Sequence, residues 1–284
     1  MTRELPATAW TAGVVVVRPD HRMGSESFVH DLLAGMEQRV QSANGSLLLR
    51  IATSPAEEEQ VYRRWAGAGT VSAVILLHIR NGDSRLALLR ELGLPTLVVG
   101  NPEGAHTPAV WSDHAEAIRL AVTTLVDLGH RCIGRVAGPS ELRSVTIRSA
   151  AFDAVCAELG VSGVEVHADL TQATGRSVTL GLLRSPELPT AIVFDNDLMA
   201  LGGLEAATDA GLRVPDDVSL LSWDDSALTQ LARPPLSTVG LDVEAAGQTA
   251  AAVLIDLIGG VDAGSVRLPR PTLTRRRSLG ASPR

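Results

Sequence analysis

Two adjacent carboxylates, Asp224 and Asp225, follow directly after the apolar run 218–223. Such a pair can serve as a catalytic acid and base, a metal clamp, a ligand-binding group or a helix cap, and each role implies a different class of protein. An apolar run of this kind is typical of a buried strand. The two side chains leave the strand end in different directions, which favours one inward hydrogen-bonding group and one helix cap.

Polar side chains also follow other predicted strands. Asn196 comes directly after the strand "TAIVFD", and Asp113 comes a short way after "PTLVVG". Arg148 closes the stretch "PSELRSVTIR" that follows the strand "CIGRVAG". Because ligands of open parallel sheets bind at the carboxyl ends of the strands, these groups predict a polar cleft between two lobes.

Most signatures of enzymes are missing from the chain. There is no lysine, which excludes Schiff-base lysine catalysis and lysine-dependent phosphate loops, and there is no G-x-S-x-G, H-E-x-x-H or C-x-x-C motif. The glycine-rich stretch 67–72 resembles a dinucleotide fingerprint, but it follows a helix and precedes a strand, the reverse of the required order, so it predicts a turn. His114 and His130 flank a helix and are interpreted as cap or surface residues. No metal ion and no cofactor are expected.

Composition narrows the class further. The formal net charge is −7, whereas a nucleic-acid binder usually presents a basic face, and the basic run 275–277 is interpreted as a solvated strand edge. No apolar run is long enough to cross a bilayer, and the first ten residues do not resemble a signal peptide, so a cytoplasmic protein is expected. Cys132 and Cys156 are too few for a disulfide framework and are expected to be reduced.

Strand-like runs alternate with helical periods along the chain. The expected strands are 12–17, 45–52, 71–79, 95–100, 132–138, 164–168, 190–195, 218–223 and 266–273. The expected helices are 28–40, one that opens at Ser54-Pro-Ala-Glu57, 84–92, 114–128, 147–159, 175–184, 197–210 and 243–258. This alternation predicts an α/β fold with parallel sheets covered on both faces. So many elements would make one very wide sheet, so two similar lobes are expected.

The segment 194–239, with "FDNDLMALGGLEAA" and "VSLLSWDD", resembles the regulatory core of the lactose-repressor (LacI/GalR) family of transcriptional regulators. The stretches "LVDLGHRCIG", "RSAAFDAVCAELG", "FVHDLLAGME" and "LPRPTLTRRRS" extend the resemblance from about Ala12 to Ser278. It implies the type I periplasmic-binding-protein fold, in which two parallel-sheet lobes are joined by three crossover segments and hold a small molecule in their cleft. The implied lobes are 12–113 plus 241–268 and 114–240 plus 269–284.

The resemblance also implies seven effector-binding residues. They are Phe28, Asp113, Ser144, Arg148, Leu170, Asn196 and Asp224. A carboxylate pair and an arginine together bind hydroxyls or an amine through charge-assisted hydrogen bonds, which agrees with a polar effector. For Arg148 the alternative is a structural ion pair with an aspartate of the cleft. Asp224 is therefore expected to bind the ligand, and Asp225 to cap the short helix that follows.

Three departures from the family pattern limit what is carried over. The loop "RPDHRMGSES" is longer than usual and lacks the Asn-Pro-aromatic turn, and the family's Asp-Asn pair is Asp113-His114 here. About ten residues precede the first strand, too few for the family's helix-turn-helix headpiece. Either the chain is the core of a longer repressor, or it is a natural protein that has lost DNA binding. The chain itself is not expected to bind operator DNA.

The leading hypothesis is the ligand-sensing core of a regulator that binds a small polar effector, a sugar, and couples it to DNA binding through a headpiece that is absent here. The alternatives are a solute-binding receptor for transport and an enzyme that uses Asp224 and Asp225. A homodimer is expected, in which exposed apolar residues on lobe-edge helices such as 82–92 would be covered. No contact with a membrane is expected.

Overall fold

The computed structural model describes residues 8–18, 27–102 and 107–283. The chain divides into an N-terminal unit, Met1–Ser112 with Asp242–Leu268, and a C-terminal unit, Asp113–Leu241 with Pro269–Arg284. In the described part of the chain each unit is built on one six-stranded, largely parallel sheet, so the predicted α/β fold is confirmed. No helix in these residues has both the length and the apolar character that a membrane span requires.

The sheet of the N-terminal unit has the order β11-β5-β4-β3-β1-β2, and its neighbouring strands are parallel. Its strands are β1 (Trp10–Val17), β2 (Gly45–Ala52), β3 (Ala73–Leu76), β4 (Thr96–Val99), β5 (Ala109–Trp111) and β11 (Val266–Arg267). Its helices are α1 (Ser27–Ser42), α2 (Pro55–Ala68), α3 (Ser84–Glu91) and α9 (Val243–Ile258). Helix α2 begins as predicted, because the Ser54 hydroxyl accepts a hydrogen bond from the backbone N–H of Glu57 at 3.2 Å.

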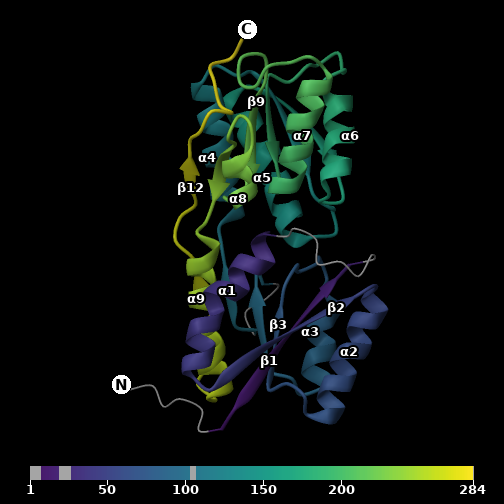
Figure 1. Ribbon diagram of the computed structural model, residues 1–284, viewed down its shortest axis with the longest axis vertical. Coiled ribbons are helices and arrows are strands. Elements are labelled where there is room, and N and C mark those ends of the chain that lie inside the picture. The colour runs from purple at the N-terminus through teal and green to yellow at the C-terminus, as the bar shows by residue number, and fades with distance from the viewer. Residues whose placement is uncertain (1–7, 19–26, 103–106, 284) are drawn as a thin grey trace. The chain divides into compact units, whose positions relative to one another are not determined.

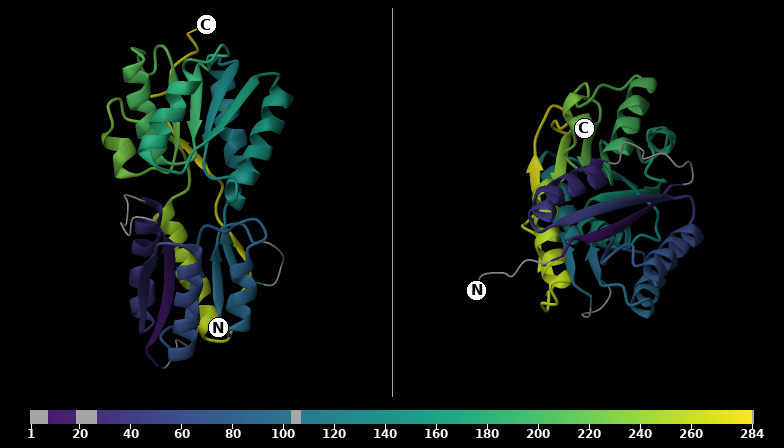
Figure 2. Two further views of the ribbon diagram at one scale, coloured as in Figure 1. Left: turned by 90° about the vertical axis from the view of Figure 1, so that its right-hand side faces the viewer. Right: turned by 60° about the horizontal axis from the view of Figure 1, so that its bottom comes forward.

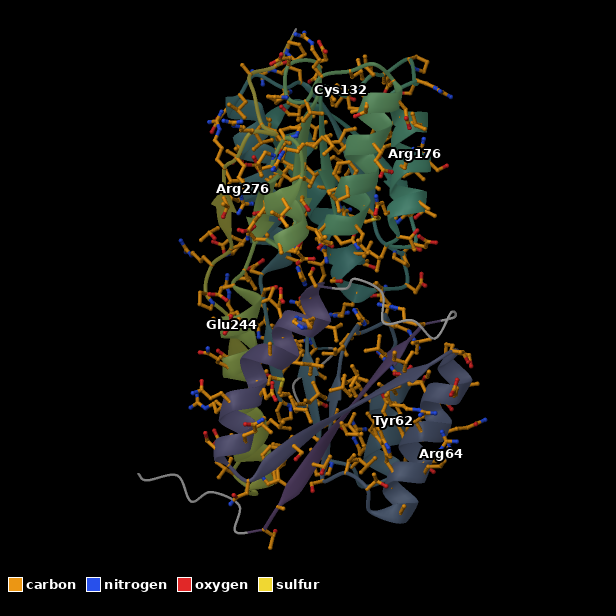
Figure 3. The ribbon with its side chains drawn as sticks, in the orientation of Figure 1. Tyr62, Arg64, Cys132, Arg176, Glu244 and Arg276 are labelled. Atoms are coloured by element: carbon orange, nitrogen blue, oxygen red, sulfur yellow. The ribbon has the colours of Figure 1, made fainter. Side chains whose placement is uncertain are left out.

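Helices α1 and α9 lie side by side in this unit (Figure 1). A Cβ atom on Gly35 would lie 2.1 Å from the backbone oxygen of Glu244, and one on Gly247 would lie 2.2 Å from that of Leu32. Glu244 is labelled in Figure 3. Any side chain at either glycine would therefore force the two helix backbones apart, which explains why both positions are glycine.

Helices α2 and α3 enclose a network of buried charges (Tyr62 is labelled in Figure 3). Arg85 donates to Glu58 at 2.8 Å and to Asp83 at 2.6 Å, and the Tyr62 hydroxyl donates to Glu58 at 2.8 Å. Burial and the Glu58 carboxylate raise the pKa of Tyr62 above its usual range. Burial opposes the charge on Arg85, but hydrogen bonds and charge from Asp83 and Glu58 outweigh it and raise the pKa of Arg85. Tyr62 therefore stays protonated and Arg85 stays charged near neutral pH.

The C-terminal sheet has the order β12-β10-β9-β8-β6-β7, in which β12 is antiparallel to β10 and the other neighbours are parallel. Its strands are β6 (Cys132–Ala137), β7 (Ser162–His167), β8 (Ala191–Phe194), β9 (Ser219–Trp223), β10 (Ser237–Gly240) and β12 (Thr272–Thr274). Its helices are α4 (His114–Asp127), α5 (Arg143–Leu159), α6 (Gln172–Leu182), α7 (Asp197–Asp209) and the short α8 (Ala227–Leu231).

Alternate residues of the C-terminal sheet face two separate cores. In β8, Ala191 and Val193 pack into the core formed with α4 and α5, whereas Ile192 and Phe194 pack into the core formed with α6 and α7. The helices on the two faces can be followed in Figure 2. Because both faces are covered, β8 is apolar along its whole length. The polar residues that follow β8 and β9 are therefore held at the carboxyl edge of a rigid sheet.

Two expectations about the terminal strand and the apolar surface are wrong. The single strand expected at 266–273 is two short strands, β11 and β12, in different sheets, because the prolines at 269 and 271 lack the N–H that a continuous ladder needs. Helix α3, within the expected 82–92, does not expose its leucines: Leu88 and Leu89 are buried, and Leu86 is partly buried. These leucines pack against the core of their own unit.

Candidate functional site

The guanidinium of Arg148 lies over the indole ring of Trp223, the last residue of β9. The Arg148 Cζ atom lies 4.4 Å from the centre of the indole ring, a distance typical of a cation–π contact. Arg148 projects from α5 and is only 7% exposed. Its Nε atom is buried and has no hydrogen-bond partner among the described residues. Burial lowers the pKa of Arg148, but a guanidinium remains charged at any pH of interest.

The imidazole of His114 lies on the same indole. The ring centres of His114 and Trp223 are 6.1 Å apart with planes at 43°, and the His114 Nδ1 atom is buried without a hydrogen-bond partner among the described residues. Burial and the nearby Arg148 charge lower the pKa of His114 to about 3, so the ring is neutral at physiological pH. A neutral imidazole and a charged guanidinium thus both present hydrogen-bonding atoms beside one aromatic ring.

A chain of alternating charges, three of them buried, holds Arg148 in place. This charge chain consists of Glu165, Arg135, Asp195 and Arg148. Asp195, which follows β8, lies 3.2 Å from Arg148 Nη1 and 2.8 Å from Arg135 Nη2. Burial alone would raise the pKa of Asp195, but Arg148, Arg135 and the backbone N–H of Gly138 lower it on balance. Arg148 therefore forms the structural ion pair that was the alternative hypothesis for this residue, and its partner is Asp195.

Asp224 and Asp225 interact with different arginines, and Asp225 does not have the role that was predicted for it. Asp224 is half-buried, has a left-handed backbone with φ of 61°, and its charge acts on Arg148. The prediction that Asp225 caps the next helix is wrong, because Ser226 is the N-cap of α8 and accepts from the N–H of Thr229. Asp225 instead pairs with Arg276 at 2.7 Å (Arg276 is labelled in Figure 3).

Three other predicted residues have clear local roles in the C-terminal unit. Asn196 caps α7 by accepting from the N–H of Met199 at 2.9 Å, and its amide donates to the carbonyl of Leu170 at 2.9 Å. That bond fixes Leu170, whose backbone is left-handed with φ of 71°. Asp113 caps α4 by accepting from the N–H of Glu116 at 2.9 Å. Their contacts with an effector remain predictions.

The remaining predicted residues are less constrained. Ser144 is half-buried in the first turn of α5, a helix whose N-cap makes no side-chain hydrogen bond. Phe28 lies in the first turn of α1, in the N-terminal unit, and is half-buried. The unusual loop noted in the sequence falls largely on residues 19–26, outside the described residues. In the described ranges, no group of three histidine, cysteine or acidic side chains lies close enough to hold a metal ion.

Comparisons with known proteins identify the family. A family model described as a periplasmic binding protein-like domain matches residues 122–279. The transcriptional regulator AglR of Rhizobium meliloti (strain 1021) is 30% identical over 276 residues, which cover 92% of this chain and 76% of AglR. The chain belongs to the LacI family of transcriptional regulators. It corresponds to the effector-binding core of that family.

Solved structures of transcriptional regulators have the same fold as this chain. A complex of the regulator CelR with cellobiose has a TM-score of 0.87 at 27% identity, covering 95% of this chain and 84% of that one. The lac repressor dimer bound to operator and an anti-inducer has a TM-score of 0.83 at 25% identity, covering 97% and 96%. The relatives are regulators and not enzymes, so the hypothesis that Asp224 and Asp225 are catalytic is overturned. This LacI-family core is not an enzyme.

Sequence reasoning missed four residues of the site in this LacI-family core. His114 was interpreted as a cap or surface residue, and Trp223, Arg135 and Asp195 were not singled out. His130, interpreted in the same way as His114, is 0% exposed and lies 2.9 Å from the Thr190 hydroxyl. One signal was available: an arginine in the strand "CIGRVAG" must find buried acidic partners.

Proposed function

We propose that the C-terminal unit binds a small polar effector, a sugar, at the carboxyl ends of β8 and β9, and that this LacI-family core thereby controls the DNA binding of a transcriptional regulator. The observation that carries the proposal is the guanidinium of Arg148, seated on Trp223 with its Nε atom buried and without a protein partner in the described residues. A buried donor without a partner costs free energy, which a ligand oxygen would recover.

The chemistry of this site suits a sugar. Arg148 and Asp224 offer charge-assisted hydrogen bonds to its hydroxyls, and the Trp223 indole, which is only 7% exposed, supports the guanidinium of Arg148. The two positive and two negative groups of the charge chain cancel, and Asp224 adds one further negative charge beside them. The C-terminal part of the site therefore disfavours a phosphate or carboxylate and favours a neutral polyol. The cellobiose complex of CelR supports the same class of effector.

The proposal is tested by thermal melts against a panel of neutral mono- and disaccharides, cellobiose included, with sugar phosphates as the charged comparison. A ligand that binds only the folded state raises the Tm in proportion to its saturation. We expect at least one neutral sugar to raise the Tm and to be recovered unchanged. A panel without any shift, or a shift confined to the sugar phosphates, would contradict the proposal.

Asp224→Ala is expected to weaken binding of the panel sugar that raises the Tm by about one to two decades. The substitution removes a charge-assisted contact worth roughly 1.5–3 kcal/mol. Asp225→Ala is the matched control: it breaks the partly exposed pair with Arg276, so it should cost at most about 1 kcal/mol of stability and leave the affinity unchanged. Isothermal titration measures the affinities and melts measure the stability. Equal affinities of the parent and Asp224→Ala would remove Asp224 from the site.

We also propose that the protein is a homodimer, as the lac repressor is in its operator complex. Dimers with a twofold axis are the commonest assemblies of soluble proteins, and such a dimer would contain two effector sites. Sedimentation at micromolar concentration should give the mass of two chains. A single species with the mass of one chain, 29.8 kDa, would contradict this.

A further inference from the structure

We propose that Arg135 and Asp195 are positioning residues of the effector site: they hold the guanidinium of Arg148 on Trp223 before the effector arrives. The inference rests on the proposed function, because it concerns how Arg148 meets an effector. Neither residue is expected to touch the effector itself. Both act through Arg148, and the geometry of their hydrogen bonds carries the argument.

Arg135 has no capacity left for a ligand. It lies within β6 and is 0% exposed. Its Nε and Nη2 atoms donate to the Asp195 carboxylate at 3.2 and 2.8 Å, and Nη1 donates to the Ser149 hydroxyl at 2.9 Å and to Glu165. A guanidinium donates from these three nitrogens alone, so all of them are occupied by the protein. Arg135 is thus a structural group, and its role is to fix the position of the Asp195 carboxylate.

Asp195 is fixed from three sides. Arg135 donates to its carboxylate from two nitrogens, Nε and Nη2, and the backbone N–H of Gly138 donates to Oδ2 at 3.1 Å. The remaining contact is with Arg148, whose Nη1 atom lies 3.2 Å from Oδ1 and donates to the Asp195 carbonyl at 3.2 Å. Because Arg135 and Gly138 hold the carboxylate independently of Arg148, it sets where the Nη1 end of Arg148 lies.

The consequence is an arginine that is ordered before binding. Arginine has one of the largest side-chain entropies to lose when it is immobilised, and this loss normally weakens the affinity for a ligand. In Arg148 the indole contact fixes one face and Asp195 fixes the Nη1 end, so the Nε edge remains for an effector oxygen. Without Asp195, Arg148 would lose this conformational entropy only when the effector binds, and the affinity for the effector would be lower.

The test compares Asp195→Asn with a matched control, Asp83→Asn. Asparagine keeps the shape and one accepting oxygen but removes the charge, and Arg135 retains Glu165 and Ser149 as partners. Asp83 is likewise a buried aspartate paired with a buried arginine, Arg85 at 2.6 Å, but it belongs to the N-terminal unit. A loss common to both variants would reflect stability alone.

The first readout is the Nε–Hε signal of Arg148 in a spectrum of ¹⁵N-arginine-labelled protein, identified by its disappearance in Arg148→Lys. In the parent the buried group should give a sharp signal that exchanges slowly with water. Asp195→Asn should broaden it or speed its exchange at least about tenfold, because the side chain samples other rotamers. Asp83→Asn should leave it unchanged. An unchanged signal in folded Asp195→Asn would overturn the positioning role.

The second readout is affinity for the same neutral-sugar panel, by isothermal titration. Asp195→Asn should bind the active sugar about three- to tenfold more weakly, the cost of ordering one long side chain, while Asp83→Asn binds as the parent does. Equal affinity for parent and Asp195→Asn would overturn the inference. If no sugar binds the parent, the proposed function fails, and the Arg148 signal still decides whether Asp195 positions it.

A second variant covers the case in which Asp195→Asn does not fold. Arg135→Leu/Asp195→Leu removes both charges of the buried pair together, which proteins tolerate better than removal of one partner. This double variant should also release Arg148. If its Nε–Hε signal remained sharp and slowly exchanging, Arg148 would be held by Trp223 alone and the proposal would be wrong.

Discussion

Arg85→Met is expected to lower the free energy of unfolding of the N-terminal unit by about 3–5 kcal/mol, the usual cost of leaving a buried charge without its partner. Arg85 is 4% exposed, and it pairs with two carboxylates, Glu58 and Asp83, whose side chains are each 1% exposed. It also donates to the carbonyls of Leu77 and His78 at the end of β3, at 3.2 and 2.9 Å. Methionine fills a similar volume but satisfies none of these acceptors.

The comparison variant is Arg119→Met, which breaks the ion pair between Arg119 and Glu158. That pair also has a short contact, 2.7 Å, but its side chains are 50% and 55% exposed. Exposed pairs of this kind contribute at most about 1 kcal/mol. Urea denaturation followed by circular dichroism gives both values. If Arg85→Met costs no more than Arg119→Met, the network around Glu58 does not stabilise the unit.

The long elements of this fold could be predicted from the sequence because their signals are local. The helix expected at 243–258 is the observed α9, and the strand expected at 45–52 is the observed β2. Helical periodicity accumulates over four turns, and a glycine or an N-cap residue marks each end. By contrast, β5 and β10 were not predicted. They contain one and two β-branched residues, a weaker strand signal than the three of β4, which is as short as β10.

The charge chain of the candidate site could not be predicted in the same way. Arg135 and Asp195 are 60 residues apart, and they meet because β6 and β8 are neighbours in the sheet, with Val136 in register with Phe194. Strand order follows from the packing of all the elements together and not from a local pattern. The family resemblance supplied Arg148 and Asp224, but it contained nothing about the aspartate that holds Arg148. Likewise, the sequence pattern did not distinguish Ser226, which caps α8, from its neighbour Asp225.

Phe194→Ala is expected to lower the free energy of unfolding of the C-terminal unit by about 3–5 kcal/mol, since it removes a fully buried ring from a packed core. Phe194 is the last residue of β8 and is 0% exposed. Asp195 and Asn196 follow it directly, so the ring also anchors the strand end that positions Arg148. Denaturation with urea measures the loss. A cost below about 1.5 kcal/mol would mean that the core closes over the missing ring.

Combining Gly203→Ala with Phe194→Leu tests whether the contact between the ring and helix α7 contributes to this stability. The ring packs against helix α7, where a Cβ atom on Gly203 would lie 2.2 Å from Phe194 Cζ. Gly203→Ala should therefore destabilise the parent by about 1–3 kcal/mol through overpacking. In the Phe194→Leu background the alanine methyl group at position 203 has more room. Gly203→Ala should therefore cost less stability there than in the parent. The difference between the two costs is the coupling free energy between positions 194 and 203.

The control for this cycle is Gly181→Ala in α6, where an added Cβ meets no atom within 4 Å. It should stabilise the protein by roughly 0.5–1 kcal/mol, the ordinary preference of a helix for alanine over glycine, and equally in both backgrounds. If Gly203→Ala costs the same with phenylalanine and with leucine at position 194, the ring does not set the spacing between β8 and α7. The strand end that carries Asp195 would then owe its position to the charge chain alone.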